Sequence, residues 1–124
     1  MNIKIDTKEK FTTITPEQEH LSANLTDELV LELAAYLNKD IPHIVLNLNT
    51  VKEIDAKSAE KLALLQQQFY EKHYSFVICC LQPLVEKQFD EKELLEFMNV
   101  TPTESEAWDI VQMEEIEREL LGDD

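Results

Sequence analysis

Alternating and periodic apolar residues near the start of the chain predict two strands followed by a helix. Residues 3–8 and 11–15 carry the alternating patterns IKI and FTTIT, which indicate two opening strands joined by a charged turn and ended by Pro16. Asn24 is placed to cap a following helix, with Asp27 in its first turn. The apolar face of this helix consists of leucines at helical spacing, namely Leu25, Leu29, Leu33 and Leu37.

Residues 43–69 indicate a buried strand, a short connection and a long helix. The strand is a continuous apolar run from Ile44 to Leu48, typical of a strand that is covered on both faces. Asp55 stands where a helix N-cap is expected, and the helix runs onward from Ala56. Its apolar residues recur at spacings of three and four, and they are Ala59, Leu62, Ala63, Leu65 and Phe69. We therefore expect this helix to lie against the sheet.

The second half of the chain continues the alternation of strands and helices. The run SFVICCL predicts a second buried strand, Pro83 opens a helix that extends to about Phe89, and residues 97–101 form a further strand. Thr103 and Glu106 have the spacing of a capping box for a last helix. The apolar positions of that helix are Ala107, Ile110, Val111, Met113, Ile116 and Leu120.

Two adjacent cysteines, Cys79 and Cys80, lie within the second buried strand. Successive side chains of a strand point to opposite faces, so these two are not placed to form a disulfide with each other. We expect both to be reduced residues of the core.

The order of elements favours an α/β fold with a mixed sheet, because strands first pair and then alternate with helices. The chain has 124 residues, of which 44% are apolar, which suits one domain over residues 1–124 with a single sizeable core.

The segment around the first buried strand resembles the STAS domain, which is the fold of bacterial anti-sigma-factor antagonists. The resemblance rests on the apolar strand, the sequence LNLNTV, Asp55 and a helix that opens with small residues. It extends over nearly the whole chain and implies a mixed sheet of about five to six strands with about four helices. It also implies a third short strand around residues 20–22, where the strand propensity of the residues alone does not show whether a strand forms.

In that family, a motif of Asp-Ser-Ser-Gly or Asp-Ser-Thr-Gly carries a hydroxyl that a partner serine kinase, which is also the anti-sigma factor, phosphorylates. The matching residues of this chain are Asp55, Ala56, Lys57 and Ser58, and Asn47 replaces an Asp often found at the end of the preceding strand. Lys57 stands at the acceptor position and offers no hydroxyl. It either imitates an acceptor that stays unphosphorylated or marks a site no longer used.

The other residues of this region have competing structural and functional interpretations. Ser58 is the nearest hydroxyl on the helix, but one helical step turns it by about 100° from the acceptor direction. A structural role is therefore favoured over phosphorylation, because its backbone N–H is the one that Asp55 would cap. Asp55 is expected to be a cap first and a partner contact second, and Thr50 could face the same partner surface.

Charge and composition exclude several classes of function. The formal net charge of −15 opposes binding to nucleic acid or to an anionic membrane and favours protein partners with basic surfaces. The single glycine excludes a phosphate-binding loop, and the three histidines are too isolated for a zinc site, so we expect neither cofactor nor metal. A receiver domain would need an acidic pair after the first strand, where only Asp6 occurs. Without a membrane span or signal peptide, we expect a cytoplasmic protein.

We therefore predict a non-enzymatic protein-binding module that resembles an anti-sigma-factor antagonist. Its surface from Thr50 to Leu62 would dock a serine-kinase-type anti-sigma factor, without the usual phosphorylation switch. The alternative is a scaffolding or oligomerising protein that keeps the fold and uses another face, such as the acidic last helix. The acidic residues of the last helix are expected to form a face exposed to solvent. Trp108 could either anchor an interface or pack on the sheet. The oligomeric state is left open.

Overall fold

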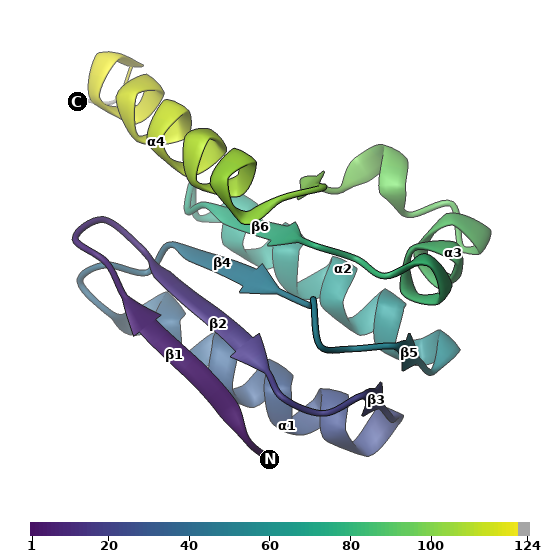
Figure 1. Cartoon of the computed structure of the whole chain (residues 1–124). Coiled ribbons are helices and arrows are strands. Elements are labelled where there is room, and N and C mark those ends of the chain that lie inside the picture. The colour runs from purple at the N-terminus through teal and green to yellow at the C-terminus, as the bar shows by residue number, and fades with distance from the viewer. Residues whose placement is uncertain (122–124) are drawn as a thin grey trace.

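The computed structural model describes residues 1–121 and contains a five-stranded mixed sheet (Figure 1). The strands are β1 (Ile3–Thr7), β2 (Thr12–Pro16), β4 (Ile44–Asn47), β6 (Phe76–Cys79) and β7 (Val100–Thr101), in the spatial order β1-β2-β4-β6-β7. β1 and β2 are antiparallel, and every other neighbouring pair in this sheet is parallel. Two short strands, β3 (His20–Leu21) and β5 (Glu53–Ile54), form a separate parallel pair.

The central strands β4 and β6 are buried on both faces, as their continuous apolar runs predict. Their side chains alternate between two cores: Ile44 and Leu46 of β4 enter the larger core, whereas Val45 enters the smaller one. The opening strands pair as expected, although Pro16 lies within β2, opposite Ile3, instead of following it.

Four α-helices cover the two faces of the sheet (Figure 1). α1 (Ala23–Ala34), α2 (Ala56–Glu71) and α3 (Pro83–Glu91) bury their apolar residues in the larger core, and short 3₁₀ turns follow α1 and α3 at Ala35–Asn38 (η1) and Leu95–Phe97 (η2). α4 (Glu104–Leu121) covers the other face, where Ala107 and Val111 meet Val45 and Val77.

The start of α1 differs from the prediction. Ser22, not Asn24, is its N-cap, and the Ser22 hydroxyl accepts a hydrogen bond of 3.2 Å from the Leu25 amide. The short strand β3 ends at Leu21, so the helix can begin two residues earlier than expected. Asp27 consequently lies beyond the first turn, where it forms an ion pair with Lys61 of α2.

The strand predicted over residues 97–101 is shorter than expected. Phe97 belongs to η2 and its side chain is 81% exposed, so only Val100 and Thr101 join the sheet. Of the two cysteines, Cys79 is buried as expected, whereas Cys80 is only partly buried; both are free thiols.

α4 is held by apolar contacts in its first half and by polar contacts in its second. Thr103 caps it, since its hydroxyl accepts from the Glu106 amide, but the Glu106 carboxylate binds that hydroxyl and not the backbone N–H of a full capping box. Further along, the Ser75 hydroxyl donates to the Glu114 carboxylate at 2.6 Å, and Arg118 donates to the hydroxyl oxygen of Ser75 at 3.0 Å.

The apolar positions predicted for the second half of α4 do not reach the core. Met113, Ile116 and Leu120 are exposed and lie on the helix face that points away from the sheet. Trp108 packs edge-to-face against Phe11 at the end of the sheet, with a centroid distance of 5.6 Å.

Candidate functional site

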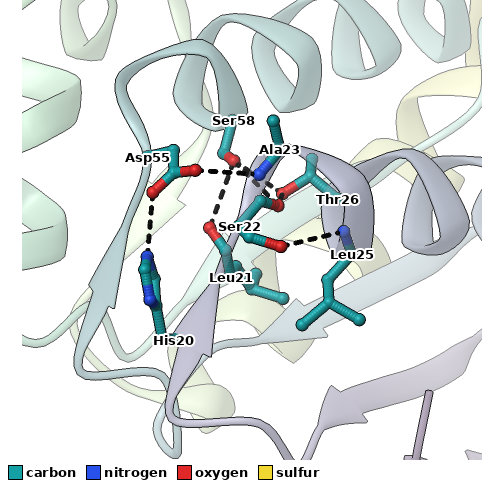
Figure 2. A network of polar contacts seen from close by, with 8 residues as sticks. All are labelled: His20, Leu21, Ser22, Ala23, Leu25, Thr26, Asp55 and Ser58. Carbon is teal, nitrogen blue, oxygen red and sulfur yellow. Dashed lines mark hydrogen bonds and ion pairs between the residues drawn. The ribbon is translucent and has the colours of Figure 1, made fainter.

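The residues that correspond to the family motif lie where the chain leaves β4 and enters α2. The connection passes through β5, whose pairing with β3 brings the start of α1 next to the start of α2. Side chains from both helix starts therefore meet in one polar network (Figure 2).

Asp55 occupies the N-cap position of α2, but its carboxylate caps the neighbouring helix instead. Its Oδ2 accepts a hydrogen bond of 3.0 Å from the Ala23 amide, the first residue of α1, and its Oδ1 lies 2.8 Å from Nε2 of His20 (Figure 2). No hydrogen bond joins the Asp55 side chain to an amide of α2. The prediction that Asp55 caps α2 is therefore wrong, because the helix that it caps is α1. A carboxylate at this place satisfies a free N–H of α1 and meets the positive end of its dipole.

These hydrogen bonds also perturb the ionisation of Asp55. The bond to His20, followed by the bond to the Ala23 amide, lowers the pKa of its carboxyl group below the usual value, because both bonds favour the charged form. The carboxylate therefore remains ionised at neutral pH and fixes β3 against the start of α2.

Ser58 is fully buried, with 0% of its surface exposed, and faces α1. Its hydroxyl lies 2.6 Å from the Thr26 hydroxyl and 3.3 Å from the Leu21 carbonyl oxygen (Figure 2). The Ser58 amide donates to the backbone carbonyl of Asp55 and not to its carboxylate. Phosphorylation at this oxygen would require the two helices to separate.

Ala56 and Lys57 are the exposed part of the motif. Both side chains face solvent, and Lys57 forms no ion pair with any residue in the range 1–121. The cation of Lys57 stands at the positive end of the α2 dipole, next to the ionised carboxylate of Asp55.

Thr50 lies in the preceding turn, whose shape depends on Asn47. The Asn47 side chain accepts from the Asn49 amide at 2.9 Å and donates to Glu104 of α4 at 2.7 Å. Thr50 itself is half-buried and donates only to the Asn49 side chain, at 3.3 Å. The amide of Asn47 can make both contacts, whereas an aspartate could not donate to Glu104.

Two residues of the network, His20 and Thr26, were not identified from the sequence, nor was the contact by which Asn47 joins the turn after β4 to α4. His20 and Thr26 are distant from Asp55 and Ser58 in the sequence, so only the pairing of β3 with β5 reveals their contact. The sequence contained one signal for this contact. Ser58 stands where the family motif has glycine, and a hydroxyl that becomes buried at this position requires a hydrogen-bond partner.

The site combines an exposed cation, Lys57, with a buried hydroxyl, Ser58. Within residues 1–121, no group of His, Cys, Asp and Glu is arranged to hold a metal ion, and no helix has the length and apolar character needed to cross a bilayer. The nearest hydroxyl, Ser58, is buried against acceptor carbonyls without an adjacent base, so it is not arranged as a nucleophile.

Comparison with known proteins identifies related folds. The family model of the STAS domain matches residues 2–107. A candidate anti-sigma factor antagonist from Thermotoga maritima superposes with a TM-score of 0.79 at 20% identity, over 89% of this chain and 94% of that chain. The anti-sigma factor antagonist SpoIIAA in its unphosphorylated form superposes with a TM-score of 0.72 at 16% identity, over 90% and 97%.

The same fold also occurs inside longer proteins. Murine Slc26a9, an anion transporter, superposes with a TM-score of 0.70 at 15% identity over 84% of this chain but only 18% of its own. No curated protein matches the chain. At these identities the solved structures establish the fold alone.

Proposed function

Since this chain belongs to the STAS domain family, we propose that it is a non-enzymatic binding module that docks a serine-kinase-type anti-sigma factor without being phosphorylated by it. The docking surface extends from Thr50 along the exposed start of α2. In this proposal Lys57 occupies the acceptor position, so the complex is regulated by protein abundance or by another protein and not by a phosphate.

The observation that carries the proposal is the division of the motif into a fixed and an exposed half. Asp55 and Ser58 are tied inward to α1, whereas Ala56 and Lys57 face solvent. A rigid corner of this kind is preorganised for a partner, since little ordering entropy remains to be lost on binding. The position at which the family carries its hydroxyl is thus accessible but chemically inert towards a serine kinase.

The proposal is tested by affinity capture of the tagged protein from its source cells, followed by reconstitution with the captured anti-sigma factor and ATP. We expect the intact mass of the wild-type protein to remain unchanged, because Lys57 offers no hydroxyl. The Lys57→Ser variant should gain one phosphate.

Lys57→Glu should weaken the purified complex, and Lys72→Glu is the matched control because it makes the same charge change at the other end of α2. Stoichiometric phosphate on Ser58 of the wild-type protein would contradict the loss of the switch. Failure to recover any kinase-type anti-sigma factor would reject this partner class.

One observation favours the alternative of a scaffolding or oligomerising protein. The outward face of α4 carries an apolar stripe formed by Met113, Ile116 and Leu120. Their spacing of three and four residues is that of helix-packing positions. Sedimentation velocity distinguishes the two functions, since concentration-dependent assembly that is lost in Ile116→Asp but retained in Lys57→Glu would support the alternative.

A further inference from the structure

A groove runs between residues 60–70 of α2 and the segment that connects α3 to β7. It has a volume of about 530 Å³, and its apolar lining consists of Ala63, Leu64, Leu94, Phe97 and Met98. This volume is within the range of concave binding sites in proteins, which is about 300–1,000 Å³. We call it the Phe97 groove.

The groove presents unusually exposed apolar side chains. Phe97 is 81% exposed and Leu64 is 61% exposed, and they stand on opposite walls. Large apolar side chains that are exposed together around a concave surface mark an interaction site more often than isolated exposed residues do.

Two of the polar side chains that line the groove, Gln66 and Tyr70, are already engaged with the sheet, whereas the other two, Glu60 and Gln67, are exposed. Gln66 donates to the carbonyl oxygens of Phe76 and Asn99 and accepts from the Asn99 amide, and the Tyr70 hydroxyl donates to the Phe76 carbonyl oxygen. A small polar ligand would therefore find few groups in the interior to orient it, whereas apolar side chains would lose no hydrogen bond on entry.

The lip of the groove is acidic. Glu93 and Glu96 are adjacent in the chain to Leu94 and Phe97 of the groove wall, and Asp90 lies in the last turn of α3. All three are exposed and form no ion pair within residues 1–121. The nearby Lys92 is engaged by Glu60 at 3.3 Å across the gap between α3 and α2. An incoming segment therefore meets apolar walls bordered by uncompensated negative charge.

We propose that the Phe97 groove docks a segment of a partner protein whose apolar side chains are flanked by Lys or Arg. Its apolar residues cover Phe97 and Leu64, and its cations face the acidic lip. A second copy of this chain fits poorly, because it would bring one acidic lip against another and a net charge of −15 against the same charge.

This surface goes beyond the proposed function, since it does not depend on the identity of an anti-sigma factor or on the acceptor position. It does extend the same helix face, because Lys57, Glu60 and Leu64 follow one another at spacings of three and four along α2. One partner could thus cover both the start of α2 and the groove.

The test uses synthetic peptides as probes and the intact chain as the receptor. The first peptide has Leu-Phe-Leu between two pairs of Lys, the second replaces the Lys residues with Glu, and the third replaces the apolar residues with Ser. Methyl NMR spectra locate binding through the signals of Leu64, Leu94 and Met98. We expect only the first peptide to shift these signals to saturation.

Variants separate the apolar contact from simple charge attraction. Phe97→Asp adds a negative charge, so it would strengthen a purely electrostatic contact, yet we expect it to weaken binding by about tenfold or more because the anchor is lost. Leu31→Asp is the control, since Leu31 is 73% exposed on α1 and does not line the groove.

Any of the following outcomes would overturn the proposal: no saturable binding of the first peptide, equal binding of the Ser peptide, equal or tighter binding of the Glu peptide, shifts confined to another surface, or unchanged affinity of Phe97→Asp. Self-association of the wild-type protein that Phe97→Asp abolishes would also overturn it, in favour of a second copy as occupant. None of these results depends on whether Lys57→Ser accepts phosphate.

Discussion

Because Ser58 is buried and Lys57 is exposed, the same substitution should change the free energy of unfolding in opposite directions at these two positions. We consider the same new residue, aspartate, at Ser58 and at Lys57. A carboxylate at Ser58 would lie at a fully buried position beside the carbonyl oxygens of Leu21 and Ser22, with the Thr26 hydroxyl as the donor within reach. A carboxylate at Lys57 would be solvated.

The expected magnitudes follow from this difference. Burying an unpaired carboxylate costs several kcal/mol, and the lost hydroxyl contact adds about 1 kcal/mol. The favourable dipole at the start of α2 returns only about 0.3–1 kcal/mol. Ser58→Asp should therefore lower the free energy of unfolding by about 3 kcal/mol or more, out of the roughly 5–15 kcal/mol typical of such domains.

Lys57→Asp should have the reverse effect. It removes a cation from the positive end of the α2 dipole and places an anion there, so we expect a gain of about 0.3–1 kcal/mol. Urea denaturation at pH 7 measures both variants against the wild-type protein, with an unchanged slope as the check on two-state behaviour. The reasoning is refuted if Ser58→Asp is as stable as the wild-type protein, because the hydroxyl would then be accessible to a kinase.

Two further predictions concern other parts of the fold. Burial, followed by the charge of Arg118, lowers the pKa of His43 from 6.5 to about 4, against the opposing influence of Glu115. Its Nδ1 accepts from the Ser75 amide at 3.0 Å, so the folded state favours neutral His43, and the stability from this group is complete above about pH 6.5 and lost as the pH falls towards 4. Urea denaturation between pH 7 and pH 4.5 should show a loss of unfolding free energy that is smaller in His43→Gln, and the same dependence of unfolding free energy on pH in both proteins would disprove it. His73 has a φ of 63°, at the left-handed position that follows α2, so His73→Gly should raise the unfolding free energy by about 1 kcal/mol while His73→Ala gives no gain. Equal effects of Gly and Ala would contradict a conformational origin.

Patterns of apolar residues were sufficient to predict the elements of the sheet and most of the helices. β4 and β6 satisfy the expectation for strands covered on both faces, and α2 begins at Ala56 as predicted. These elements are set by local periodicity, which a single sequence displays directly.

The targets of polar side chains were harder to predict, because they depend on long-range pairing. Asp55 was expected to cap its own helix, and the choice between α2 and α1 is decided only when β3 pairs with β5. The cap of α1 was predicted at Asn24, and this prediction is wrong, because β3 ends at Leu21 and the helix is capped by Ser22 directly after it.

The exposed apolar residues show the limit of periodicity as evidence for burial. Ile116 and Leu120 have the spacing of a buried helix face, but the sheet is covered by the opposite side of α4. Phe97 was assigned to a strand from its apolar neighbours, and it instead stands at the edge of the groove. A periodic apolar face indicates that something will cover it, and a partner can do so as well as the core.

The cross-helix cap formed by Asp55 has a consequence for the dynamics of the domain. Because the carboxylate at the start of α2 holds the first amide of α1, neither helix start can open without releasing the other. Hydrogen exchange in the first turns of both helices is therefore governed by one local opening event and not by two separate ones. A partner that rests on Lys57 alone would slow exchange at the start of α1, a region that it does not touch.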